Sequence, residues 1–98
     1  MREKQIEEKL RQAVTERGGL AIKFISPSLI GIPDRLLLMP GGSLAFVEVK
    51  QPGGKVRKVQ NRRIEQLQAL GFKCYVLDSL LAIPKIMEEV VADELHST

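Results

Sequence analysis

The chain has 98 residues, with 15 Lys and Arg against 12 Asp and Glu, which gives a formal net charge of +3. This length fits one domain, residues 1–98, and the modest charge does not by itself name a partner. Cys74 is the only cysteine, which excludes a disulfide framework within the chain and a cysteine zinc cluster. No apolar run approaches the ~20 residues of a membrane span and no signal peptide opens the chain, so we expect a cytoplasmic protein without membrane contact.

The N-terminal segment, to about Arg17, is expected to be a helix that ends at Gly18. Its apolar residues recur at helical spacing and are Ile6, Leu10, Ala13 and Val14. Glu3 and Glu7 lie four residues apart beside this apolar stripe, whereas Glu8 points further round the helix. These acids are either a solvated face paired with nearby Lys and Arg, or the source of one carboxylate for a site.

The next segment, Leu20 to Ile25, has the composition of a strand and carries Lys23 inside it. Ser26-Pro27-Ser28 then breaks the pattern, and a flexible Leu29–Gly31 segment follows. From Gly31 the chain is predicted to form a β-hairpin, described next.

The stretch from Gly31 to Lys50 contains two apolar runs joined by a Pro40–Ser43 turn with two glycines, which indicates a β-hairpin. Asp34 lies at the start of the first strand, which is expected to run to Met39. The second strand is expected to cover Leu44–Lys50.

On the second strand, Glu48 and Lys50 project from one face, whereas Val47 and Val49 face the other way. Asp34 lies across the hairpin from these two charges. Charges among mostly buried strands are costly unless they are paired or bind a metal, so this cluster indicates a site. The two carboxylates offer hard oxygen ligands suited to Mg²⁺ or Mn²⁺. Lys50 can orient or deprotonate a water and stabilise negative charge on a phosphate.

A second helix is predicted from about Arg57 to Leu70, with Gly71 as its C-terminal stop. Gln60 falls on the inward stripe of this helix, where it either makes a structural hydrogen bond or reaches the site. Basic residues cluster around the start of the helix, ahead of its first acid, and are Lys55, Arg57, Lys58, Arg62 and Arg63. This block is either a solvated face or a surface for a nucleic-acid backbone.

A strand over Phe72–Leu77 follows, and Asp78-Ser79 can cap a final amphipathic helix with Pro84 in its first turn. The apolar residues of that helix either cap the core of the monomer or supply a dimer face, and they are Ile83, Ile86, Met87, Val90 and Val91. The predicted order is α-β-β-β-α-β-α, whose β-α-β portion implies a parallel strand pair. We therefore predict an α/β fold with a small mixed β-sheet flanked by helices.

Three features together resemble a known family: Gly31-Ile32-Pro33-Asp34-Arg35, Phe46-Val47-Glu48-Val49-Lys50 and the downstream Gln60. They look like the PD-(D/E)XK nuclease pattern, and most closely its VRR-NUC branch, the virus-type replication-repair nuclease domain. The resemblance extends from the first helix to about Leu77 and is greatest to the small standalone members carried by phages. It implies a restriction-endonuclease-like core. The site residues it implies are Asp34, Glu48 and the backbone carbonyl of Val49 for the metal, and Lys50, Gln60 and Glu7 for catalysis, with Glu3 as the reserve first-helix glutamate.

The resemblance implies a metal-dependent, structure-selective DNA endonuclease that cuts four-way (Holliday) junctions or related branched DNA as a homodimer. The cofactor would be Mg²⁺ or Mn²⁺, and the place of action the host cell cytoplasm if a phage encodes the chain. DNA contacts are expected from Lys23, Ser26, Lys55, Arg57, Lys58, Arg62 and Arg63. Two alternatives stay open: a non-catalytic DNA-binding module on a nuclease-like fold, and a nuclease acting on ordinary duplex, single strands or RNA.

Overall fold

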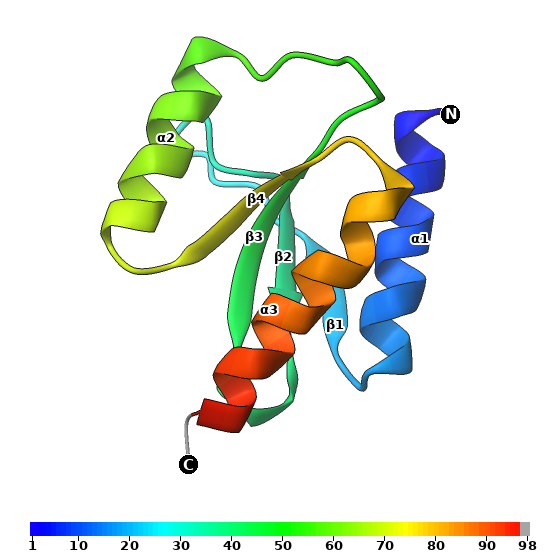
Figure 1. Cartoon of the computed structure of the whole chain (residues 1–98). Helices are drawn as coiled ribbons and strands as arrows, with labels where there is room; N and C mark the ends of the chain where they lie inside the picture. Colours follow the sequence, from blue (N-terminus) through cyan, green and yellow to red (C-terminus); the bar gives the residue numbers. More distant parts are fainter. Residues whose placement is uncertain (97–98) are drawn as a thin grey trace.

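A mixed β-sheet with helices on both faces makes up the described part of the chain, residues 1–96, with side chains described as far as Val91 (Figure 1). The structure is a computed structural model. Its elements run in the order α1 (Glu3–Glu16), β1 (Leu20–Lys23), β2 (Arg35–Leu38), the 3-10 turn η1 (Pro40–Gly42), β3 (Leu44–Val49), α2 (Lys58–Ala69), β4 (Lys73–Leu77), the 3-10 turn η2 (Leu80–Ala82) and α3 (Ile83–His96). This order confirms the predicted succession of helices and strands.

The four strands lie in chain order, β1-β2-β3-β4. The first three pair antiparallel, with Arg35 opposite Val47 between β2 and β3. β4 pairs parallel to β3, with Glu48 opposite Val76, after the chain has crossed over through α2. The predicted hairpin and the predicted parallel pair are therefore both present. Because β2 and β3 are antiparallel, the start of β2 lies beside the end of β3.

Two hydrophobic clusters hold the helices on the sheet, and β3 contributes to both. Ala45, Val47 and Val49 are fully buried beneath α1 and α3, in the larger cluster. Phe46 lies in the smaller cluster on the opposite face, with Ile64, Leu67 and Cys74. This alternation confirms the predicted faces of β3 and leaves Glu48 on the side of α2.

The final helix closes the monomer core. Ile83, Ile86, Met87 and Val90 are all buried in the larger cluster, so these side chains cap the core rather than form a free face. Pro84 stands in the first turn of α3, and the Ser79 hydroxyl accepts from the Leu81 N–H at 3.2 Å. No helix within residues 1–96 combines the length and apolarity needed to cross a bilayer.

The segment between β1 and β2 differs from the expectation. β1 ends at Lys23, two residues before Ile25, and one further cross-strand bond, from the Phe24 N–H to the Asp34 carbonyl at 2.8 Å, closes the base of the loop. Gly31, expected to be flexible, has φ +84° and packs so closely on α2 that a Cβ would lie 2.7 Å from the Val59 carbonyl oxygen. The loop is therefore fixed to α2, a contact between residues far apart in the sequence.

Candidate active site

Asp34 and Glu48 meet where β2 begins and β3 ends. The backbone N–H of Asp34 donates a hydrogen bond of 3.3 Å to Oε1 of Glu48. The Glu48 side chain is almost completely buried, with 4% of the residue exposed. Oδ1 of Asp34 is also buried and has no hydrogen-bond partner. An unpartnered buried carboxylate oxygen is costly, which sets this pair apart from the structural ion pairs of the chain.

The environment raises the pKa of Asp34. Burial is the main cause, followed by the negative charges of Glu48 and Glu7, while Arg35 acts in the opposite direction. The negative charge of Glu48 disfavours ionisation of Asp34 in this way, and a bound cation would relieve the repulsion.

Lys50 completes the cluster one step beyond β3. Its Nζ lies 3.3 Å from Oε2 of Glu48, so Glu48 contacts both neighbours at once, Asp34 through one oxygen and Lys50 through the other. The Lys50 backbone N–H donates to the Leu77 carbonyl at 2.8 Å, which extends the pairing with β4 and holds the lysine in place. The predicted cluster of Asp34, Glu48 and Lys50 is thus brought together on one face.

The backbone of Val49 is oriented by the same pairing. Since Leu77 bonds to Lys50 in the parallel ladder, the N–H and C=O of Val49 point away from β4, toward the strand that carries Asp34. The side chain of Val49 is fully buried on the opposite face of the sheet. The carbonyl is therefore on the side of β3 that faces β2, as a further oxygen ligand requires.

Gln60 lies on the sheet-facing side of α2 and is 6% exposed. Its Oε1 accepts from the backbone N–H of Arg57 at 3.2 Å, which satisfies one of the free donors at the start of the helix. The structure thus gives Gln60 a structural hydrogen bond, one of the two predicted roles. Its burial beneath α2 also keeps it on the face of the sheet that carries Glu48.

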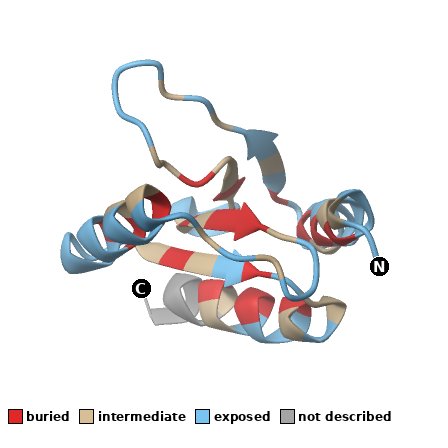
Figure 2. Cartoon of the chain, turned by 90° about the horizontal axis from the view of Figure 1, so that it is seen from above, coloured by how far each residue is buried: buried red, intermediate tan, exposed pale blue. Residues whose placement is uncertain are grey.

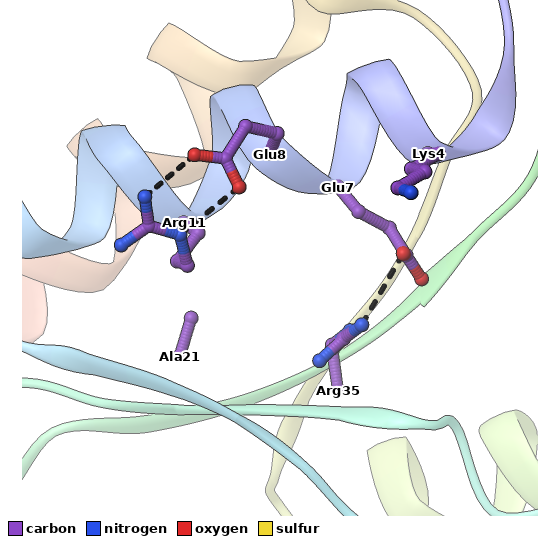
Figure 3. Close-up of a pocket in the computed structure, with 6 residues that line it drawn as sticks. All are labelled: Lys4, Glu7, Glu8, Arg11, Ala21 and Arg35. Atoms are coloured by element: carbon purple, nitrogen blue, oxygen red, sulfur yellow. Dashed lines mark hydrogen bonds and ion pairs between the residues drawn. The ribbon is translucent and has the colours of Figure 1, made fainter.

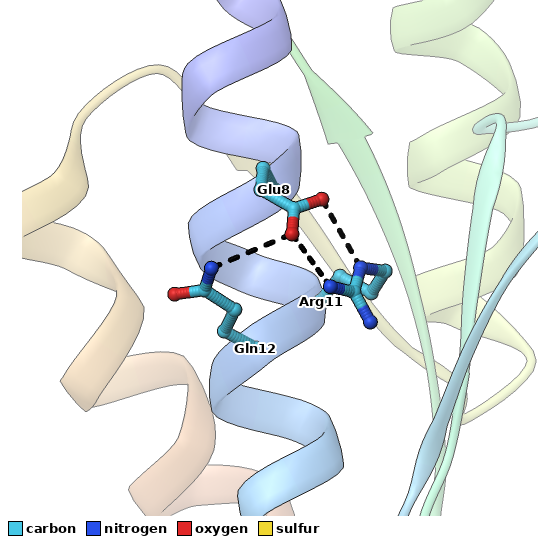
Figure 4. A network of polar contacts seen from close by, with 3 residues as sticks. All are labelled: Glu8, Arg11 and Gln12. Atoms are coloured by element: carbon cyan, nitrogen blue, oxygen red, sulfur yellow. Dashed lines mark hydrogen bonds and ion pairs between the residues drawn. The ribbon is translucent and has the colours of Figure 1, made fainter.

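Among the glutamates of α1, Glu7 is the one associated with the site. Its Oε2 lies 3.2 Å from a guanidinium nitrogen of Arg35, the residue directly after Asp34, and its charge contributes to the raised Asp34 pKa (Figure 3). Glu8 instead pairs with Arg11 on the exposed side of the helix and accepts from Gln12 (Figure 4).

The cavity in Figure 3, of about 420 Å³, lies between α1 and the sheet. Lys4 is among its charged lining residues, and the other four form two ion pairs, Glu7 with Arg35 and Glu8 with Arg11. The cavity lies next to Asp34, because Arg35 lines it. The ion pair between Glu7 and Arg35 fixes both side chains there. Sequence reasoning missed Arg35, although its place directly after Asp34 in the Pro-Asp-Arg motif is a signal that could have found it.

Comparison with known proteins assigns the family. The model of the VRR-NUC domain matches residues 1–80. The chain belongs to the VRR-NUC domain family. A protein named "Putative nuclease p44" from Acyrthosiphon pisum secondary endosymbiont phage 1 is 47% identical over 79 residues, which cover 81% of this chain and 85% of that protein. A solved VRR-NUC domain superimposes with a TM-score of 0.81 at 28% identity, covering 88% of this chain and 94% of the other.

Membership of the VRR-NUC family makes this a nuclease-type domain, so its donor set can be tested against the metal that such a site would use. Among the described residues, no three His, Cys, Asp or Glu side chains are grouped to hold a metal ion unaided. The oxygen donors of Asp34 and Glu48 nevertheless fit Mg²⁺ or Mn²⁺, because Mg²⁺ usually takes only one or two carboxylates and completes its shell with water and substrate phosphate. The buried, unpartnered Oδ1 of Asp34 is consistent with that fit.

The residues expected to contact DNA in this VRR-NUC domain differ in their exposure. The exposed ones are Lys23, Lys55, Arg57, Lys58 and Arg62. Ser26 is partly buried in the loop after β1. Arg63 is also partly buried, and its Nε donates to the Ile30 carbonyl at 3.0 Å, so it already holds that loop against α2. The exposed residues are available for phosphate contacts, whereas Arg63 has a structural partner.

Proposed function

We propose that this VRR-NUC domain is a metal-dependent, structure-selective DNA endonuclease that cuts four-way junctions or related branched DNA as a homodimer. The observation that carries the proposal is the cluster at the ends of β2 and β3: a buried carboxylate pair, one unpartnered oxygen and an adjacent lysine. The name of the phage relative, a putative nuclease, supports nuclease activity, and we place that activity in the host cell cytoplasm.

The residues of the cluster divide the tasks of phosphodiester hydrolysis between metal binding and water activation. Asp34, Glu48 and the Val49 carbonyl would hold Mg²⁺ or Mn²⁺, which polarises the phosphate and lowers the pKa of an attacking water. Lys50, held beside Glu48 by their ion pair, would orient that water and donate to a phosphate oxygen as negative charge develops on it. Gln60 fixes the first turn of α2 beside the sheet, and Glu7 holds Arg35 next to Asp34.

The exposed basic residues of α2 and of the loop before it bind the DNA backbone. Lys55, Arg57, Lys58 and Arg62 project from this segment, and Lys23 lies on the edge strand β1. Phosphate contacts of this kind position the duplex without reading its sequence. The choice of substrate then depends on DNA shape, which is the basis for proposing structure selectivity.

A homodimer with one site per subunit matches the symmetry of a four-way junction. The buried apolar residues of α3 face the monomer core, so they do not supply a dimer surface. Leu70, Phe72 and Val76 are exposed large apolar residues beside or on the edge strand β4, and we assign the interface to this region. Light scattering of the purified protein tests this, with Leu70→Lys expected to halve the molar mass.

The decisive experiment is cleavage of labelled four-way junction, flap, linear duplex and single-stranded DNA with Mg²⁺, with Mn²⁺ and with chelator. Metal-dependent paired nicks in the junction are expected for the natural sequence. Lys50→Ala should lose cleavage by a factor of about 10²–10⁴ while retaining junction binding. Lys9→Ala, which removes an exposed lysine of α1, serves as the matched control.

Two results would replace this proposal with an alternative. Junction binding without a cut under either metal would point to a non-catalytic DNA-binding module. Cleavage of linear duplex or single-stranded DNA at the same rate as the junction would keep the nuclease and remove the structure selectivity.

A further inference from the structure

The loop between β1 and β2 exposes aliphatic side chains that the fold does not use. Ile25 is 73% exposed, Ile30 70% and Leu29 41%. Figure 2 shows this segment standing out from the sheet, exposed along most of its length before it returns to the buried Pro33. Exposed aliphatic residues grouped on one loop are a feature of interaction surfaces.

The loop is held in place at three points. The Phe24 N–H donates to the Asp34 carbonyl at its base, and the Phe24 ring packs edge-on to Phe46 with centroids 6.3 Å apart. Arg63 Nε donates to the Ile30 carbonyl, and Gly31 packs directly on Val59. These contacts present Ile25 and Ile30 as fixed projections rather than as a freely moving segment.

The base of the loop is the active site itself, because Asp34 both closes the loop and belongs to the carboxylate pair. The chain from Leu20 to Pro33 contains Lys23 and no acidic residue. Exposed Arg62 and Lys58 project from α2, the helix to which the loop is attached. At an opened base step, DNA presents apolar base faces between its charged phosphates. The exposed aliphatic side chains can contact those bases, while the neighbouring cations bind the phosphates.

We propose that residues 25–30 form an apolar wedge that inserts Ile25 and Ile30 into an opened or branched DNA step beside the cleavage site. This inference rests on the proposed nuclease function and names its specificity element. Insertion between stacked bases is costly in continuous duplex and much less so where the stack is already interrupted. The wedge therefore selects branched or distorted DNA, while the basic residues hold any duplex.

The test uses binding in chelator, so that it does not depend on cleavage. A four-way junction carrying 2-aminopurine at the branch point reports unstacking by a rise in fluorescence, and anisotropy gives the affinity. The natural sequence should bind the junction and raise the fluorescence. The double variant Ile25→Ser, Ile30→Ser should lose the rise and bind the junction about tenfold more weakly, with linear duplex binding unchanged. Leu81→Ser, at a residue 90% exposed on η2, is the matched control.

Three results would overturn the wedge. These are binding of the junction without a fluorescence rise, an equal loss of junction and duplex affinity in the double variant, and a lower molar mass of that variant with DNA binding intact. The last would make the loop a protein interface. Circular dichroism checks folding, and the single variant Ile25→Ser replaces the double variant if the latter does not fold. The cleavage assay tests the nuclease proposal separately: that proposal fails if the natural sequence does not cut DNA with either metal.

Discussion

The backbone N–H of Asp34 donates to the Glu48 carboxylate at 3.3 Å, so a main-chain donor joins the two acids. This arrangement brings the two carboxylates together while leaving Oδ1 of Asp34 buried and unpartnered. The unliganded protein thus carries an unfavourable interaction that a divalent cation relieves, since a ligand that binds the folded state stabilises it.

Replacing Asp34 by Asn should stabilise the protein at neutral pH in chelator. The pKa of Asp34 is raised by folding, so the folded state holds its proton more tightly than the unfolded chain does. The natural protein consequently loses stability as pH rises from the ordinary value of 3.8 through the raised one, and stays less stable above it. Asp34→Asn lacks this loss, and its urea midpoint should exceed that of the natural sequence above this range and match it below.

Asp78→Asn is the control for that measurement, because Asp78 is exposed. At neutral pH in chelator, its urea midpoint should stay at that of the natural sequence. An Asp34→Asn midpoint that is lower than that of the natural sequence at neutral pH would contradict the conclusion that the carboxylate is destabilising in the absence of metal.

The affinity for Mn²⁺ should fall as pH is lowered through the raised pKa of Asp34. Metal ligation requires the carboxylate, so below that pKa each bound ion must displace a proton. Calorimetry in buffers of different ionisation enthalpy measures the released proton directly. Proton release should approach one per ion at the acid end and vanish at neutral pH. Release of the same number of protons at every pH would exclude Asp34 as the linked group.

The site could be predicted from the sequence where its parts are local. Alternation along β3 predicts that Glu48 and Lys50 share one face, and the hairpin turn brings Asp34 opposite them; the contacts at 3.3 Å follow from these two rules. The family assignment and the element order depend on the same short-range patterns. These predictions hold because the alternation along a strand and the geometry of a turn fix the relative placement of residues that are close in the sequence.

The contacts that the sequence could not reveal are tertiary. Helical spacing sets Glu8 apart but places Glu3 and Glu7 together, and only the packing of α1 against the sheet decides that Glu7 meets Arg35. In the same way, Arg63 belongs to a basic block by sequence, but in space its Nε reaches the Ile30 carbonyl. Such pairings depend on how whole elements pack, which no window of neighbouring residues contains.

The Cys74 thiol should be protected from alkylation and from disulfide exchange in the folded protein. Burial raises its pKa to about 11, and the nearby Glu48 charge adds to the effect. The reactive thiolate is then a minor species at mildly alkaline pH, about two orders of magnitude rarer than in the unfolded chain. Labelling with an aromatic disulfide reagent should accelerate by at least that factor in urea. Equal rates in the folded and unfolded protein would show that the cluster around Cys74 opens readily.

Arg62 and Arg63 should behave differently despite being adjacent and chemically identical. Arg62 is exposed, so Arg62→Ala should weaken DNA binding uniformly and reduce the slope of log affinity against log salt by about 0.9, the value for one lost phosphate contact. Its free energy of unfolding should stay unchanged. Anisotropy titrations of linear duplex over a range of salt concentrations measure the slope.

Arg63→Ala removes the hydrogen bond from Nε to the Ile30 carbonyl, one of the two contacts that hold the loop on α2. The free energy of unfolding should fall by about 1 kcal/mol, the usual net contribution of such a bond. Hydrogen exchange should increase over residues 25–31, and the salt slope should change little. If both variants instead lower the salt slope equally and leave unfolding unaffected, Arg63 binds phosphate like its neighbour, and the loop does not depend on it for its position.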